Sequence, residues 1–141
     1  MPDDPNAKLP QDSYSNRHWA QKFKISIRGL RIGLTGAQSP NSLNSFVIHV
    51  PVGIAVLLTG IGIGLEPIPI SLLVLCIGTV MAAELLNSSL ESLAKAITKQ
   101  TDQNVANALD IASGAVLLMS LTASIVGALI LGIPMVQMWT P

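Results

Sequence analysis

The chain has 141 residues, of which 50% are hydrophobic and only 11% are charged. A soluble domain usually carries about 25% charged residues. This composition therefore excludes a soluble globular domain, because the charged residues are too few to cover a water-facing surface. The formal net charge is +0, and the single cysteine excludes a disulfide framework within the chain.

The first part of the chain is predicted to be a tail. Residues 1–16 are rich in Pro, Asp, Asn and Ser, a composition typical of disorder. The first charges are followed by polar sequence rather than by a short apolar region, so no cleavable signal peptide is expected. At this length one domain is expected, and we assign it to residues 17–141.

Residues 17–35 mix cationic and apolar side chains, and Trp19, Phe23 and Ile27 recur at helical spacing. This pattern predicts an amphipathic helix in the membrane interface, with its cations toward anionic headgroups. A solvated basic linker is the alternative interpretation. Residues 36–45 are predicted to be a loop from their Gly, Pro, Ser and Asn content.

Three apolar segments follow, and each is predicted to cross a membrane. Phe46–Leu65 and Ala112–Ile133 contain no Asp, Glu, Lys or Arg and reach the length of about 20 residues that a span needs. Ile68–Leu86 is apolar except for Glu84 near its end. With their helical extensions, the predicted spans cover about residues 46–65, 68–97 and 108–133.

The basic residues set the expected orientation of these spans. They lie before residue 32 and at Lys95 and Lys99, whereas the connector 66–69 and the segment from residue 134 onward contain none. Cytoplasmic loops carry an excess of Lys and Arg. We therefore expect the N-terminus and the connector after the second span to be cytoplasmic, an alternation that three spans satisfy.

Polar residues gather near that cytoplasmic boundary. Glu84, Asn87 and Glu91 recur at i, i+3 and i+7, so they share one face of a helix. Asp110 and Ser113 lie at i and i+3, where the third apolar segment begins. Ionisable groups at such depths are costly, which makes these residues candidates for function.

This set of side chains suggests a chemistry. Carboxylate and amide oxygens can hold Mg²⁺, which usually brings substrate phosphates with it, and a carboxylate near a lipid hydroxyl can accept its proton. A structural interpretation is also open. In it, Glu91 and Lys95 form an i, i+4 ion pair, Asp110 is a charge near a helix N-terminus, and Glu84 packs against a neighbour.

Two stretches carry a resemblance to a known family. Residues 83–97 (AELLNSSLESLAKAI) and 108–118 (ALDIASGAVLL) resemble the prokaryotic diacylglycerol kinase and undecaprenol kinase family of integral membrane lipid kinases. The hallmark of that family is a Glu-x-x-Asn-x-x-x-Glu run and then, nineteen residues later, an Asp that opens an Asp-x-x-Ser/Ala-x-Ala-Val segment. The residues that match this hallmark are Glu84, Asn87, Glu91, Asp110, Ser113, Ala115 and Val116.

The resemblance implies a homotrimer of three-span protomers in the bacterial inner membrane. It implies transfer of the γ-phosphoryl group from MgATP to a membrane lipid alcohol, either diacylglycerol or undecaprenol. By position, Glu84 would be the general base, Asn87 would orient the substrate or the base, and Glu91 would hold Mg²⁺. Asp110 and Ser113 would line the nucleotide site. ATP and Mg²⁺ are the expected cofactors, and no nucleic-acid partner is expected.

The chain departs from the family pattern at two positions. Leu43 stands where members usually have a metal-binding Glu, and Leu109 stands where they usually have a Lys that contacts phosphate. We expect Lys95 to contribute to nucleotide binding instead, with Asn44, Asp102 and Lys99 as the other nearby candidates. The alternative hypothesis is a catalytically impaired member that binds a lipid or a partner without turnover. A proton or ion carrier built on Glu84 is a third hypothesis, but the spans hold too few polar groups to line a path.

Overall fold

The computed structural model describes residues 19–35, 46–97 and 102–139. Within these residues the chain is helical and contains no strand, which confirms the predicted all-α class for this part of the chain. The helices are α2 (Trp19–Thr35), α3 (Phe46–Gly62), α4 (Pro67–Ile97) and α5 (Gln103–Trp139). The predicted tail at 1–16, the loop at 36–45 and Leu43 lie outside the described residues.

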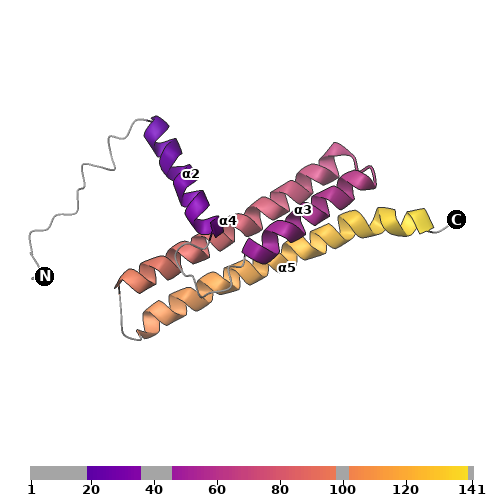
Figure 1. Ribbon diagram of the computed structural model, residues 1–141. Coiled ribbons are helices and arrows are strands. Elements are labelled where there is room, and N and C mark those ends of the chain that lie inside the picture. Colours follow the sequence, from indigo (N-terminus) through magenta and orange to yellow (C-terminus); the bar gives the residue numbers. More distant parts are fainter. Residues whose placement is uncertain (1–18, 36–45, 98–101, 140–141) are drawn as a thin grey trace, which may run out of the picture.

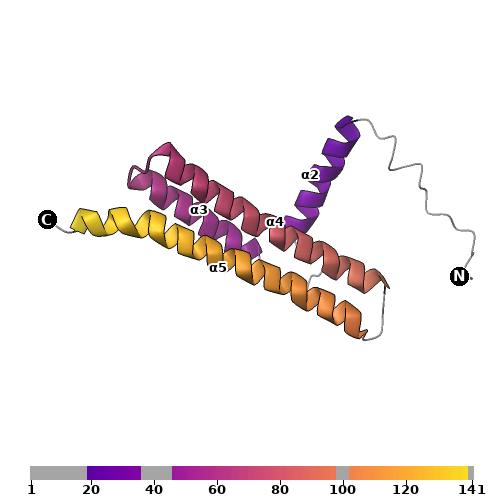
Figure 2. The same ribbon diagram turned by 180° about the vertical axis from the view of Figure 1, so that it is seen from behind.

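Three of the helices lie side by side and the fourth stands away from them (Figure 1). α4 pairs with α5 along most of its length, and α3 packs mainly on α4. α3 lies beside only one half of this pair, so α4 and α5 both extend past its first residue, as the view from behind also shows (Figure 2). The α3–α4 turn lies at the same end as the C-terminus of α5, and the C-terminus of α4 and the N-terminus of α5 lie at the other end.

α3 ends in a short turn that explains where the second apolar helix begins. Gly64 has φ +72°, a left-handed conformation that suits glycine. The amide of Leu65 donates to the carbonyl of Gly60, and the amide of Gly64 donates to the carbonyl of Ile61, both at 3.0 Å. These bonds form the Schellman motif that closes a helix C-terminus. Pro67 then opens α4, at the first helical position where its missing amide hydrogen costs nothing.

Small residues allow α3 to approach α4 closely. Gly53 and Gly60 are both buried, and a Cβ atom on Gly60 would lie 3.0 Å from Cδ1 of Ile70 and 3.2 Å from Cδ1 of Leu65. Within a bilayer, helices associate through such close packing rather than through the hydrophobic effect. Gly60 is therefore a packing contact between α3 and α4.

A large side chain at Gly60 is expected to push the two helices apart. Gly60→Leu should cost about 1–3 kcal/mol, the usual range for overpacking, and should lower the thermal unfolding midpoint of the detergent-solubilised protein. The matched control is Gly62→Leu, because a Cβ atom on Gly62 meets nothing within 4 Å. Equal midpoints for the two variants would show that the contact does not hold α3 on α4.

α2 confirms residues 19–35 of the helix predicted over 17–35 and argues against the linker interpretation. Trp19, Phe23 and Ile27 are all exposed, and the helix meets α4 where Gly33 approaches the side chain of Leu85. The C-terminal part of α2 therefore contacts α4 at Leu85, the residue that follows Glu84. The placement of its apolar face in a membrane interface stays a prediction.

α4 and α5 are each long and apolar enough to cross a membrane. In the most apolar window of each, only 17% and 6% of the residues are buried inside the chain, whereas the core helix of a soluble protein would be mostly buried. Their apolar surfaces therefore face lipid or another protein chain. These two helices agree with the predicted second and third spans.

The first predicted span is shorter than expected. α3 is apolar but has 17 residues and rises about 26 Å, close to the hydrocarbon thickness of about 30 Å. It ends at Gly62 rather than near residue 65 because the left-handed Gly64 closes the helix. The third membrane crossing therefore stays a prediction.

Candidate active site

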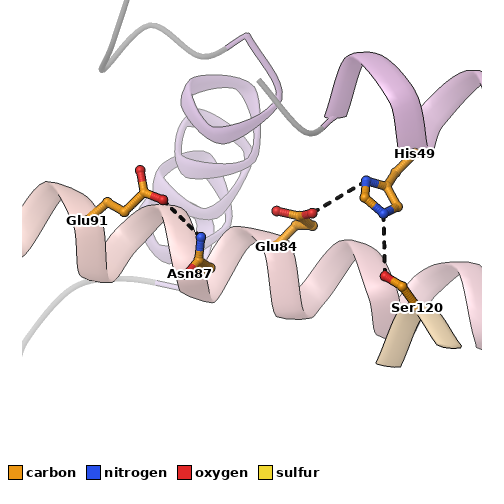
Figure 3. A network of polar contacts seen from close by, with 5 residues as sticks. All are labelled: His49, Glu84, Asn87, Glu91 and Ser120. Carbon is orange, nitrogen blue, oxygen red and sulfur yellow. Dashed lines mark hydrogen bonds and ion pairs between the residues drawn. The ribbon is translucent and has the colours of Figure 1, made fainter. Parts of the chain in front are cut away.

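A buried carboxylate joins three helices at the point where α3 begins. The side chain of Glu84 on α4 is 4% exposed, and its Oε1 lies 3.4 Å from Nδ1 of His49 on α3. The other ring nitrogen, Nε2, lies 3.4 Å from Oγ of Ser120 on α5. Figure 3 shows His49 between the two partners. We call Glu84, His49 and Ser120 the His49 cluster.

The Ser120 contact differs from those that most hydroxyls make in these helices. Thr59, Ser71 and Thr122 each donate to the carbonyl of the residue four positions earlier in their own helix. Such local bonds satisfy a hydroxyl in an apolar setting without any tertiary contact. The hydroxyls of Ser120 and Ser113 instead reach side chains on another helix, so these two positions mark polar contacts between helices.

A second cluster lies further along the same face of α4. Nδ2 of Asn87 donates to Oε1 of Glu91 at 3.0 Å, and Oγ of Ser113 on α5 donates to Oδ1 of Asn87 at 3.5 Å. This pattern fixes the amide orientation, because a carboxylate can only accept and so must face the NH₂ group. We call Asn87, Glu91 and Ser113 the Asn87 cluster; Figure 3 shows its Asn87–Glu91 bond beside Glu84.

The two clusters lie at the depth where a membrane boundary is expected. Glu84 lies seventeen residues beyond Pro67, the first residue of α4, a rise of about 26 Å. The hydrocarbon core of a bilayer is about 30 Å thick. A bilayer that begins near Pro67 would therefore place Glu84 just inside the opposite boundary and Glu91 outside it.

Lys95 and Asp110 are the two predicted site residues that the clusters do not include. Lys95 lies in the last turn of α4 and is exposed, and Asp110 is exposed on α5 one turn before Ser113. In the described part of the chain, Glu91 accepts a hydrogen bond from Asn87 and forms no ion pair with Lys95. The i, i+4 ion pair between Glu91 and Lys95 that the structural interpretation proposed is therefore absent. The side chains of Lys95 and Asp110 are exposed rather than buried between the helices.

The acidic residues suit one kind of magnesium site and not another. Among the described residues, no three His, Cys, Asp or Glu side chains are grouped closely enough to enclose a metal ion. Mg²⁺, however, is usually bound by one or two carboxylates together with substrate phosphates. Glu91 is half-buried and has one oxygen held by Asn87. It therefore fits a magnesium ion carried by a phosphate, but not an all-protein cage.

An apolar groove of about 650 Å³ lies between α3, α4 and α5. Its walls are mostly aliphatic, and His49 and Ser120 are among its few polar lining residues. The groove extends along α5 from Ser120 to Gly132, a rise of about 18 Å. An apolar groove that ends at polar groups suits a molecule with one hydrocarbon end and one polar end.

Sequence reasoning had missed the partners of Glu84. His49 is an imidazole in a segment without Asp, Glu, Lys or Arg, and Ser120 resembles the other hydroxyls of its helix. Nothing in the sequence relates either residue to Glu84. The role of Asp102 was also missed. Its Oδ1 accepts from the amides of Asn104 and Val105, at 2.8 Å and 3.1 Å, which makes it the N-cap of α5.

Comparisons with known proteins place both clusters inside one matched region. A family model described as prokaryotic diacylglycerol kinase matches residues 25–131. A protein named diacylglycerol kinase from Synechocystis is 38% identical over 137 residues, which cover 95% of this chain and 75% of that protein. No solved structure matches the chain.

Proposed function

The chain belongs to the prokaryotic diacylglycerol kinase family, and on that basis we propose that it transfers the γ-phosphoryl group of MgATP to the hydroxyl of a membrane lipid. The observation that carries this proposal is the placement of Glu84. A buried carboxylate lies within hydrogen-bonding range of the histidine at one end of an apolar groove, one helical turn from the Asn87 cluster. A lipid hydroxyl and a phosphate could meet there.

In the proposed reaction, Glu84 accepts the proton of the lipid hydroxyl as its oxygen attacks the γ-phosphorus. The bond between that phosphorus and the bridging oxygen breaks, and ADP leaves with the electron pair. Phosphoryl transfer depends mainly on positioning and on stabilising charge. A carboxylate held at a fixed place can therefore contribute without any covalent step of its own.

The Asn87 cluster is proposed to hold the phosphate end of the nucleotide. Glu91 would ligate Mg²⁺, which would neutralise phosphate charge when bound, and Asn87 would hold the Glu91 carboxylate in place through its 3.0 Å bond. Asp110, Ser113 and Lys95 are proposed to contact the nucleotide. Asp110 is exposed near the N-terminus of α5, and Lys95 is exposed near the C-terminus of α4. A water-soluble nucleotide can reach both residues there.

We further propose a homotrimer in the bacterial inner membrane, with a cytoplasmic N-terminus. Many large apolar side chains stay exposed on α3, α4 and α5, so a single chain leaves wide surfaces for lipid or for further copies. A neighbouring protomer would bring further acidic groups to Glu91, beyond those that the described residues of one chain gather there.

The experiment that tests this function is a lipid kinase assay in mixed micelles. The purified chain is given labelled ATP with either diacylglycerol or undecaprenol, with and without Mg²⁺. Magnesium-dependent labelling of one lipid is expected, and it identifies the substrate. Absence of labelling with both lipids would overturn the kinase proposal and favour a non-enzymatic membrane protein.

A further inference from the structure

His49 links the proposed base to the end of the apolar groove. Its side chain is 29% exposed, whereas that of Glu84 is 4% exposed, and His49 rather than Glu84 lines the groove. A lipid hydroxyl that enters from the groove therefore meets the imidazole beside the carboxylate. The orientation of this ring decides how the carboxylate faces the groove.

Both ring nitrogens have a partner, and the two partners lie on different helices. When Nδ1–H donates to Oε1 of Glu84, a neutral ring presents Nε2 as an acceptor, to which the Ser120 hydroxyl can donate. The carboxylate of Glu84 only accepts and so favours this tautomer, and the hydroxyl of Ser120 is compatible with it because a hydroxyl can donate. A histidine held in this way by a second partner is a common means of fixing a ring that acts on another group.

The glutamate cannot fix its own carboxylate plane. The last torsion of a glutamate side chain is broad, because it joins an sp³ carbon to an sp² carbon. The contact to His49 at 3.4 Å restrains Oε1. The contact therefore restricts how the carboxylate plane of Glu84 can rotate.

We propose that His49 is a positioning residue for phosphoryl transfer, which orients the Glu84 carboxylate while Ser120 holds its ring. This inference rests on the proposed function. It assigns His49 no contact with the nucleotide and no covalent step. The contacts of 3.4 Å are longer than the usual 2.9–3.0 Å or so, and hydrogen bonds of this kind often tighten only when substrate binds.

Two amide variants separate positioning from simple helix packing. In His49→Asn the side-chain amide can take the place of Nδ1 and still donate to Glu84, but it does not reach Ser120. In His49→Gln the amide can take the place of Nε2 and still reach Ser120, but it loses the donor to Glu84. His49→Ala loses both contacts. Steady-state kinetics would be measured for all three, together with thermal unfolding in detergent.

The expected order of kcat is wild type, then His49→Asn, then His49→Gln and His49→Ala. The loss for His49→Ala should be about 10- to 100-fold, the range typical when a partner that orients a functional group is removed. The KM for ATP should stay unchanged, because the Asn87 cluster is untouched. Ser120→Ala should lose less kcat than His49→Ala, whereas Thr122→Ala, whose hydroxyl bonds within its own helix, should match wild type.

Other outcomes would overturn the inference. If His49→Gln keeps more kcat than His49→Asn, the histidine serves the α3–α5 contact rather than Glu84. If His49→Ala keeps the wild-type kcat, the histidine has no part in the reaction. Failure of the proposed function is distinguishable, because the wild-type chain would then label neither lipid.

Discussion

Glutamine in place of Glu84 is expected to lower kcat for lipid phosphorylation by about 10²–10⁴-fold, the usual contribution of a general base. Glutamine has nearly the same shape as glutamate, and its amide oxygen can still accept a hydrogen bond from Nδ1 of His49, the contact seen at 3.4 Å. The His49 cluster is therefore expected to stay assembled. What is lost is the ability to take a proton from the lipid hydroxyl.

The matched control for this variant is Glu66→Gln. Glu66 is exposed and lies just before α4, at the opposite end of the helix from Glu91, so its loss should leave kcat unchanged. Thermal unfolding in detergent should show similar midpoints for the wild-type protein and both variants. A Glu84→Gln protein that is folded and turns over at the wild-type rate would show that another group accepts the proton.

Much of the helical architecture could be predicted because a bilayer restricts the backbone conformations that an apolar segment can adopt. Apolar runs of the necessary length form helices in lipid, since every backbone polar group must be satisfied within the chain. Helical periodicity placed Glu84, Asn87 and Glu91 on one face, and the Asn87–Glu91 bond agrees with that placement. Such local relations depend on the helix alone and require no knowledge of tertiary packing.

Contacts between helices could not be predicted in the same way. His49 and Ser120 are 71 positions apart, and no periodicity relates them. Their contact depends on the positions of α3 and α5 along α4. For α3, this position is set by the turn at Gly64 and by close packing at Gly53 and Gly60. The structural interpretation of the sequence had Glu84 packed against a neighbour, and only the assembled bundle shows that this neighbour is His49.

Asn87 and Lys95 compete for the carboxylate of Glu91, and this competition explains why the Glu91–Lys95 ion pair of the structural interpretation does not form. Glu91 has Asn87 four residues before it and Lys95 four residues after it, and both spacings permit contact. The structure pairs Glu91 with Asn87, whose amide is itself held by Ser113 on α5. A lysine at an exposed helix end loses side-chain entropy in a surface pair that stabilises the protein by only about 0–1 kcal/mol. Interhelix contact therefore decides between two locally equivalent partners.

Glu91→Gln is expected to change the response to magnesium, whereas Glu84→Gln should not. If Glu91 is the metal ligand, the variant loses the negatively charged oxygen that binds Mg²⁺. The Mg²⁺ concentration at half-maximal rate should therefore rise strongly. Metal stabilisation of a phosphoryl transition state is worth several kcal/mol, so kcat/KM for MgATP should fall at least about 100-fold, since about 1.4 kcal/mol is a factor of ten.

Magnesium titrations of three proteins would separate the two carboxylates. Wild-type chain and Glu84→Gln should reach half-maximal rate at the same Mg²⁺ concentration although their rates differ, and Glu91→Gln should need far more of the ion. Asn87→Ala should shift the titration in the same direction by a smaller amount, because it frees the carboxylate that the 3.0 Å bond restrains. An unchanged magnesium response in Glu91→Gln would remove Glu91 from the metal site and make Asp110, the exposed carboxylate of the hallmark, the next residue to test.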